Sequence, residues 1–116
     1  MFFWKDTAEE YFRNGLRLAE QIPIRERIAG MTANLGLVAK ARGEMDLARE
    51  QLQKALTLVE PLGNHHLEVR IRIWLAPLLP AQEAQACLHS ARVLAERDGL
   101  NGLLEEIKPL ESGLDI

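Results

Sequence analysis

The chain has 116 residues and a formal net charge of −3, with 47% apolar and 27% charged residues. This length fits a single domain, and the apolar share can build a hydrophobic core, which excludes a disordered tail. No apolar stretch approaches the roughly 18–20 residues of a membrane span, and the first residues do not match a signal peptide. We therefore predict a protein with no membrane association.

The single cysteine, Cys87, cannot form a disulfide within the chain. This fits a reducing compartment, so we predict a cytoplasmic location. The mildly acidic total charge argues against a general nucleic-acid-binding protein, and nucleic acid is not the partner we expect.

Leucine and alanine supply 34 of the 116 residues and β-branched residues are few, so the composition favours helices over strands. Gly43 is placed to end one helix and Asn64 to cap the start of another. Pro77 should end or bend its helix early, because it removes a bond to the carbonyl of Ile73. Together with the other glycines and prolines, these positions predict six helices: 5–21, 24–42, 44–60, 64–79, 81–98 and 101–112.

One pattern occurs three times, as an alanine followed by a large residue, a small residue, a leucine and a glutamate. The copies are Ala8, Phe12, Gly15, Leu18 and Glu20; Ala48, Leu52, Ala55, Leu58 and Glu60; and Ala84, Leu88, Ala91, Leu94 and Glu96. The spacing puts the apolar members on one helical face, where small residues alternate with a large one. Such a face predicts close packing of one helix against another.

Leu35, Gly36 and Ala39, followed by Gly43 and the second copy of this pattern, resemble one complete tetratricopeptide repeat. In that family the Leu-Gly pair belongs to the first helix of a repeat and the alanine pattern to the second. The next unit departs from the family, because Arg72 stands where a small residue is expected. The copies also lie 40 and 36 residues apart, where the family has about 34. The chain resembles, less closely, the C-terminal long-period repeat arrays of bacterial signalling ATPases and regulators.

The resemblance implies an all-α fold, a short right-handed superhelical array of antiparallel helix hairpins with about six helices. Residues 1–116 would form a single domain of four parts. These are an unpaired second helix in 1–23, a repeat in 24–63, a degenerate repeat in 64–99, and a capping helix with a tail in 100–116. The cap would turn a polar face outward, supplied by Glu105, Glu106, Lys108 and Glu111.

In the family that the chain resembles, first helices line a concave groove and second helices lie outside. The stretches 24–43 and 64–80 have net charges of +3 and +1, whereas 44–63 between them has −2. We therefore expect a positive groove that binds a protein or peptide segment, with acidic segments favoured. The residues expected to face this groove are Asn34, Leu37, Lys40, Ala41, Arg70 and Ile73. As an alternative, the alternating charges only solvate the helices and pair neighbouring ones.

Residues capable of chemistry do not form a recognisable constellation. Cys87 and His89 point in different directions on a helix, and His65 and His66 lack the spacing of a zinc site. The pair Glu105 and Glu106 is adjacent and does not converge. We expect no enzyme, no metal and no cofactor.

Five of the six aromatic residues, Phe2, Phe3, Trp4, Tyr11 and Phe12, lie in the first twelve positions. They could pack inward on helix 24–42. Alternatively they stay exposed where a preceding helix is missing, and the chain then self-associates through them as a homo-oligomer, such as a dimer. We predict self-association.

The overall prediction is a non-catalytic protein-interaction module, a scaffold or a sensor. One alternative is a nucleic-acid-binding helical repeat with a basic face made by Arg25, Arg27, Lys40, Arg42, Arg70 and Arg72. Another is a spacer or sensor fragment of a larger signalling regulator.

Overall fold

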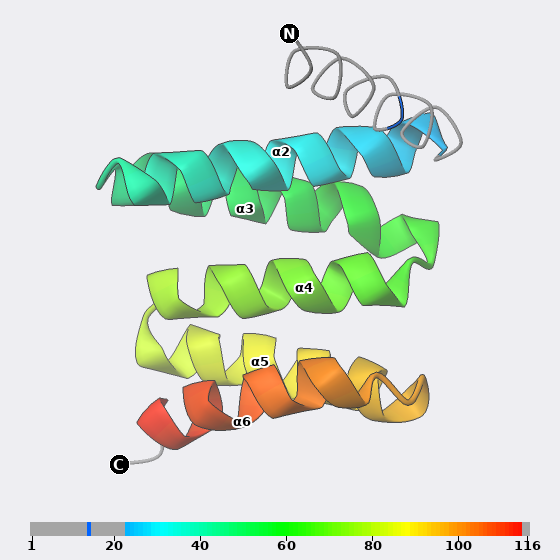
Figure 1. Cartoon of the computed structure of the whole chain (residues 1–116). Coiled ribbons are helices and arrows are strands. Elements are labelled where there is room, and N and C mark those ends of the chain that lie inside the picture. The colour runs from blue at the N-terminus through cyan, green and yellow to red at the C-terminus, as the bar shows by residue number, and fades with distance from the viewer. Residues whose placement is uncertain (1–13, 15–22, 115–116) are drawn as a thin grey trace, which may run out of the picture.

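The computed structural model describes residue 14 and residues 23–114, which are helical throughout apart from short connections and contain no strand. The predicted helix 5–21 lies outside the described residues except for Asn14, which is helical. The described part therefore holds five α-helices, where the sequence predicts six for the chain. They are α2 (Ile24–Ala41), α3 (Met45–Val59), α4 (His65–Leu75), α5 (Ala81–Arg97) and α6 (Asn101–Leu114). Figure 1 shows them stacked in chain order with alternating directions.

Two predicted helix ends are confirmed in atomic detail. Gly43 adopts a left-handed φ of 80°, and the Glu44 N–H donates to the Ala39 carbonyl at 2.9 Å, which closes α2. At the start of α4, the Asn64 side-chain oxygen accepts a hydrogen bond from the Leu67 N–H at 3.0 Å. These two positions set the α2–α3 and α3–α4 connections.

Pro77 shortens the fourth helix, as its missing N–H predicts. The α4 helix ends at Leu75 rather than at residue 79, and a 3₁₀ turn, η2 (Ala76–Leu78), follows it. In the same way α3 ends at Val59 and passes into the 3₁₀ turn η1 (Glu60–Leu62), which contains Pro61.

The α2–α3 hairpin packs closely at Gly36. A Cβ placed there would lie 2.8 Å from the Leu52 Cγ and 3.2 Å from the Ala48 carbonyl oxygen. Only a residue without a side chain lets the two helices approach this far. Ala29 and Ala33 are fully buried on the same helix, so small residues form the whole buried face of α2.

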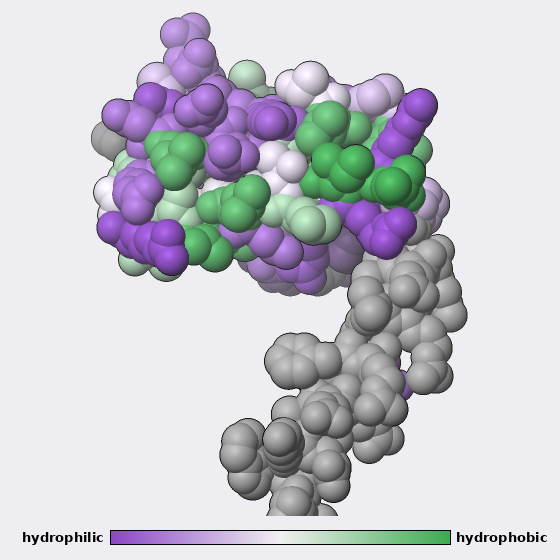
Figure 2. Space-filling model, turned by 90° about the horizontal axis from the view of Figure 1, so that it is seen from above, coloured by the Kyte–Doolittle hydropathy of each residue, from purple (hydrophilic) through white to green (hydrophobic). Residues whose placement is uncertain are grey.

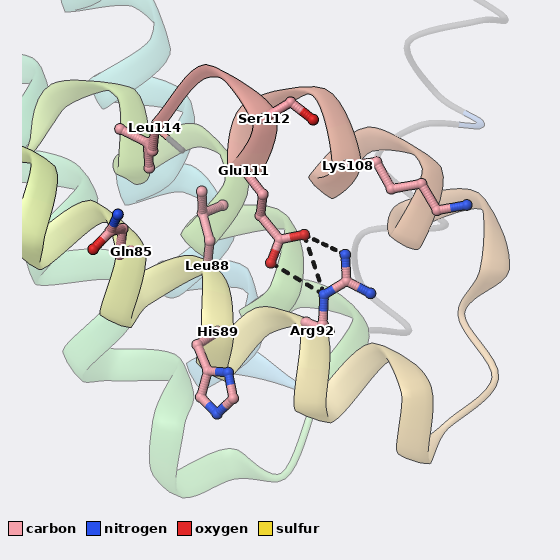
Figure 3. A pocket seen from close by; sticks show the side chains of 8 residues that line it. All are labelled: Gln85, Leu88, His89, Arg92, Lys108, Glu111, Ser112 and Leu114. Atoms are coloured by element: carbon pink, nitrogen blue, oxygen red, sulfur yellow. Dashed lines mark hydrogen bonds and ion pairs between the residues drawn. The ribbon is translucent and has the colours of Figure 1, made fainter. Parts of the chain in front are cut away.

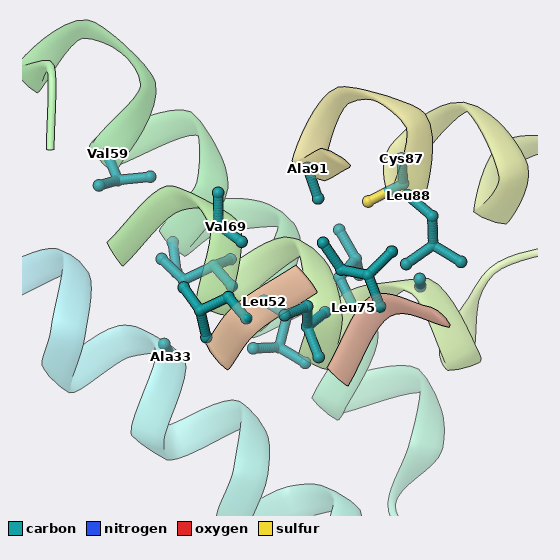
Figure 4. Packing of buried hydrophobic residues seen from close by; sticks show 14 of the residues in the cluster. Ala33, Leu52, Val59, Val69, Leu75, Cys87, Leu88 and Ala91 are labelled. Carbon is teal, nitrogen blue, oxygen red and sulfur yellow. The ribbon is translucent and has the colours of Figure 1, made fainter. Parts of the chain in front are cut away.

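The repeated pattern supplies the centre of the core. Its alanine, large and small members are buried in both described copies: Ala48, Leu52, Ala55, Ala84, Leu88 and Ala91. Figure 4 shows side chains of α3, including Val59, and of α5 in one cluster with Val69 and Leu75 of α4. The close packing predicted from the pattern is thus confirmed for α3 and α5.

The last helix turns a polar face outward, as predicted, except at Glu111, which is half-buried and ion-paired with Arg92 of α5. Leu103 and Ile107 are buried against the core, whereas Glu105, Glu106 and Lys108 are exposed. No helix among residues 23–114 combines the length and apolarity needed to cross a bilayer.

Candidate interaction surfaces

The two helices predicted to line the groove, α2 and α4, are neighbours in space, and the predicted cap α6 lies on the other side of α4. The α4 helix contacts both α2 and α6, and the Asn64 side-chain amide at its start donates to Glu26 of α2 at 3.2 Å. The α4 helix therefore lies beside both α2 and α6.

The groove residues predicted on α2 lie on this array with different exposure. Asn34, Leu37 and Ala41 are three and four residues apart, so they share one side of the helix. Asn34 and Ala41 are exposed, whereas Leu37 and Lys40 are half-buried. This side differs from the buried one, which is formed by Ala29, Ala33 and Gly36 in contact with α3.

On α4 the prediction is wrong for Ile73, and the groove role predicted for Arg70 stays a prediction. Arg70 is half-buried, but Ile73 is only 8% exposed and belongs to the core. The reason is that α4 contacts α3 on one side and α5 on the other, so its apolar residues are enclosed from two directions.

A cleft of about 210 Å³ lies beside Arg70, between α4 and the start of α6. Its lining residues are His66, Arg70, Leu100, Asn101, Gly102, Leu103 and Glu106. The basic groups come from α4 and the carboxylate of Glu106 comes from α6. The surface is consequently mixed in charge at this end and not uniformly positive.

A larger open cleft, of about 540 Å³, lies between α5 and the end of α6 (Figure 3). The Arg92 guanidinium crosses it to form an ion pair with Glu111, with its Nε 3.1 Å from both carboxylate oxygens. The hydrogen bond from Arg92 lowers the pKa of the Glu111 carboxyl group. An apolar pocket of about 240 Å³, lined by Pro77, Pro109 and Leu110 among others, lies beside it.

The sequence did not predict these two pockets. Arg92 and Glu111 are 19 residues apart on different helices, and such pairs leave no signal in helical spacing.

The arginine that departs from the repeat pattern forms an ion-pair cluster. Arg72 Nε lies 3.0 Å from Glu68 Oε2, and its Nη2 lies 3.1 Å from Glu60 Oε2. The side chains of Arg72 and Glu68 are only 13% and 11% exposed. The pairing of Arg72 with Glu68 could have been inferred from the sequence, because the two residues are four positions apart on one helix. The pairing with Glu60 could not, because Glu60 lies outside α4.

His65 and Cys87 take structural positions. His65 Nδ1 lies 2.7 Å from Asp98 Oδ2 and His66 is exposed. Cys87 is a core residue, and burial raises the pKa of its thiol. Within residue 14 and residues 23–114, no group of three or more His, Cys, Asp or Glu side chains is arranged to hold a metal ion.

An apolar stripe runs along the outer side of α2. Its members, which follow one helical face, are between 47% and 66% exposed. They are Ile24, Ile28, Met31, Leu35 and Val38. Figure 2 looks onto this side of the molecule and shows apolar side chains in a broken band among charged ones. The sequence analysis does not single out this stripe, and the face of α2 that packs on α3 is formed by small residues instead.

The residues predicted to mediate self-association, Phe2, Phe3, Trp4, Tyr11 and Phe12, all lie outside the described residues. Self-association therefore stays a prediction.

Comparison with protein-family models, curated proteins and solved structures finds no match to this chain. Its function is therefore argued from the surfaces described above.

Proposed function

We propose that the chain is a non-catalytic protein-interaction module of tetratricopeptide type, a right-handed array whose first helices α2, α4 and α6 bind a protein or peptide segment. The observation that supports this most directly is that α4 lies against both α2 and α6 and forms the cleft beside Arg70 with the start of α6. The close approach at Gly36 and the small–large alternation in α3 and α5 support the assignment to this type of repeat.

The charges on α2 and α4 favour a partner with an acidic segment. Lys40 and Arg70 supply cations and Asn34 supplies an amide, which are donors suited to carboxylates. Glu106 at the α6 end favours a basic or amide group there and so gives the bound segment a direction. Since these groups are at least partly exposed, they steer the partner more than they tighten the complex.

The test passes a random decapeptide library over the immobilised protein. The sequences of the retained peptides are read by mass spectrometry. We expect enrichment of Asp and Glu, and loss of that enrichment in the Lys40→Glu, Arg70→Glu double variant. The matched control is Lys54→Glu with Arg97→Glu, which makes the same charge change at exposed positions on α3 and α5. Retained peptides without an acidic bias, or equal loss in the control, would contradict the proposal.

The same variants test the alternative of nucleic-acid binding. A mixed face bearing Glu106 disfavours a phosphate backbone, so we expect no retention on an oligonucleotide column at physiological salt. Retention that Lys40→Glu with Arg70→Glu abolishes would favour nucleic acid over protein as the partner.

A further inference from the structure

The apolar stripe on α2 has a counterpart on α4 that is covered. A shift of 36 residues takes Met31, Leu35 and Val38 to Leu67, Ile71 and Trp74. The first three are exposed, but Ile71 is fully buried and the other two are half-buried against the core. The helix before α4 along the array, α3, contacts α4. The outer side of α2 is therefore the side on which a preceding helix would pack.

We propose that this preceding helix is residues 5–21 of the same chain, docked in antiparallel orientation on the apolar stripe of α2.

The sequence of 5–21 has the pattern that packs in the described helices. Ala8, Phe12 and Gly15 precede Ala48, Leu52 and Ala55 by 40 residues, and these three are fully buried in α3. The segment is also about as long as α2, which has 18 residues. It can therefore offer an apolar face along the whole stripe.

The residue before α2 has the same backbone conformation as the residue before α5. Pro23 precedes α2 with φ −52° and ψ 142°, and Pro80 precedes α5 with φ −56° and ψ 151°. At Pro80 the chain turns back so that α5 packs against α4 (Figure 1). In the proposed arrangement only residues 22 and 23 separate the segment 5–21 from α2, so the segment is held at a high effective concentration beside the stripe of its own chain.

Charge is complementary in the same arrangement. The stretch 24–43 has a net charge of +3, whereas 1–23 has −1. Arg27 lies beside the stripe, and its Nε is buried with no hydrogen-bond partner among the described residues. An antiparallel segment brings the acidic Glu20 to this end of α2. In this arrangement Phe12 packs on α2. This is the alternative to self-association that the sequence leaves open.

The test is amide hydrogen exchange of the full chain. We expect residues 8–20 to exchange at least about tenfold more slowly than in the free 5–21 peptide. Leu35→Asp and, separately, Phe12→Ser should abolish that protection. The matched controls are Leu47→Asp, which is exposed on α3 outside the stripe, and Arg13→Ser, which is off the apolar pattern.

Phe12→Ser changes no described residue, so it keeps the test valid if Leu35→Asp fails to fold. Exchange of residues 8–20 at the rate of the free peptide would overturn the proposal. So would protection that appears only in a dimer, detected by light scattering across a dilution series, because the stripe would then hold the segment of a second copy.

Discussion

The first helices α2 and α4 occupy matched places in consecutive hairpins but are held in different ways. Gly36 of α2 and Arg72 of α4 are equivalent in the repeat register. At Gly36 the helix approaches α3 so closely that no side chain fits. At Arg72 the side chain is instead neutralised by Glu68 and Glu60. One residue earlier, Leu35 is 59% exposed and Ile71 is fully buried. The difference teaches that helical pattern alone does not determine burial, because the neighbours that flank each helix decide which apolar side is covered.

The largest expected effect separates the matched pair Ile71 and Leu35. Ile71→Ala should lower the free energy of unfolding by about 4 kcal/mol, since it leaves a cavity in the core. Leu35→Ala should cost less, about 1–2 kcal/mol, because its side chain lies outside that core and packs only against the proposed docked segment 5–21. Urea unfolding followed by circular dichroism measures both values. Similar losses in the two variants would break the comparison.

The next effect concerns the ion-pair cluster on α4. Glu68→Ala should cost about 3 kcal/mol, because it leaves the nearly buried guanidinium of Arg72 without its closest partner. Replacing both residues by methionine should recover most of that loss, since a buried ion pair adds little over apolar packing. The same unfolding measurement applies. A double variant no more stable than Glu68→Ala would show that the ion pair stabilises the fold more than apolar packing does.

A smaller effect tests the close approach of α2 to α3. Gly36→Ala should destabilise the chain by about 1–2 kcal/mol, because the new methyl group meets Leu52 and the Ala48 carbonyl oxygen. Gly30→Ala is the matched control in the same helix, where a Cβ meets nothing within 4 Å. It should stabilise the chain by about 0.5–1 kcal/mol. Melting temperatures that move in the same direction would contradict the packing described.

The smallest effect lies at the far end of the array. Arg92 lowers the pKa of Glu111 below its ordinary value of 4.5. A carboxyl group with a lowered pKa in the folded state adds stability above its unfolded pKa, and this is lost as pH falls through the folded pKa. Glu111→Gln should therefore reduce stability slightly at pH 7 and make no difference at strongly acidic pH. A difference that persists in acid would exclude this linkage.

Much of the fold follows from local sequence signals. Gly43, Asn64 and Pro77 predict helix boundaries because their effects depend on the backbone within a few residues. The alanine pattern predicts the buried faces of α3 and α5 for the same reason. Ile73 shows the limit, since its burial depends on α3 and α5 together, and no spacing within α4 reveals that.

The candidate surfaces were less predictable than the fold. The repeat register, which is a property of the sequence, pairs Asn34 with Arg70, and their sharing a groove stays a prediction. The Arg92–Glu111 pair and the exposed stripe on α2 could not be predicted, because both depend on which helices lie beside each other. Figure 2 shows the consequence for α2, whose outer side carries apolar groups that a helical pattern alone assigns to the core.

The central claim is that the outer side of α2 is a helix-packing side like the covered side of α4. The most direct measurement is nuclear Overhauser contacts, in the full chain, between the methyl groups of Met31, Leu35 and Val38 and the ring protons of Phe12. We predict contacts within one molecule, unchanged when isotope-labelled and unlabelled chains are mixed. No contact with Phe12, or contacts only between labelled and unlabelled chains, would contradict the account.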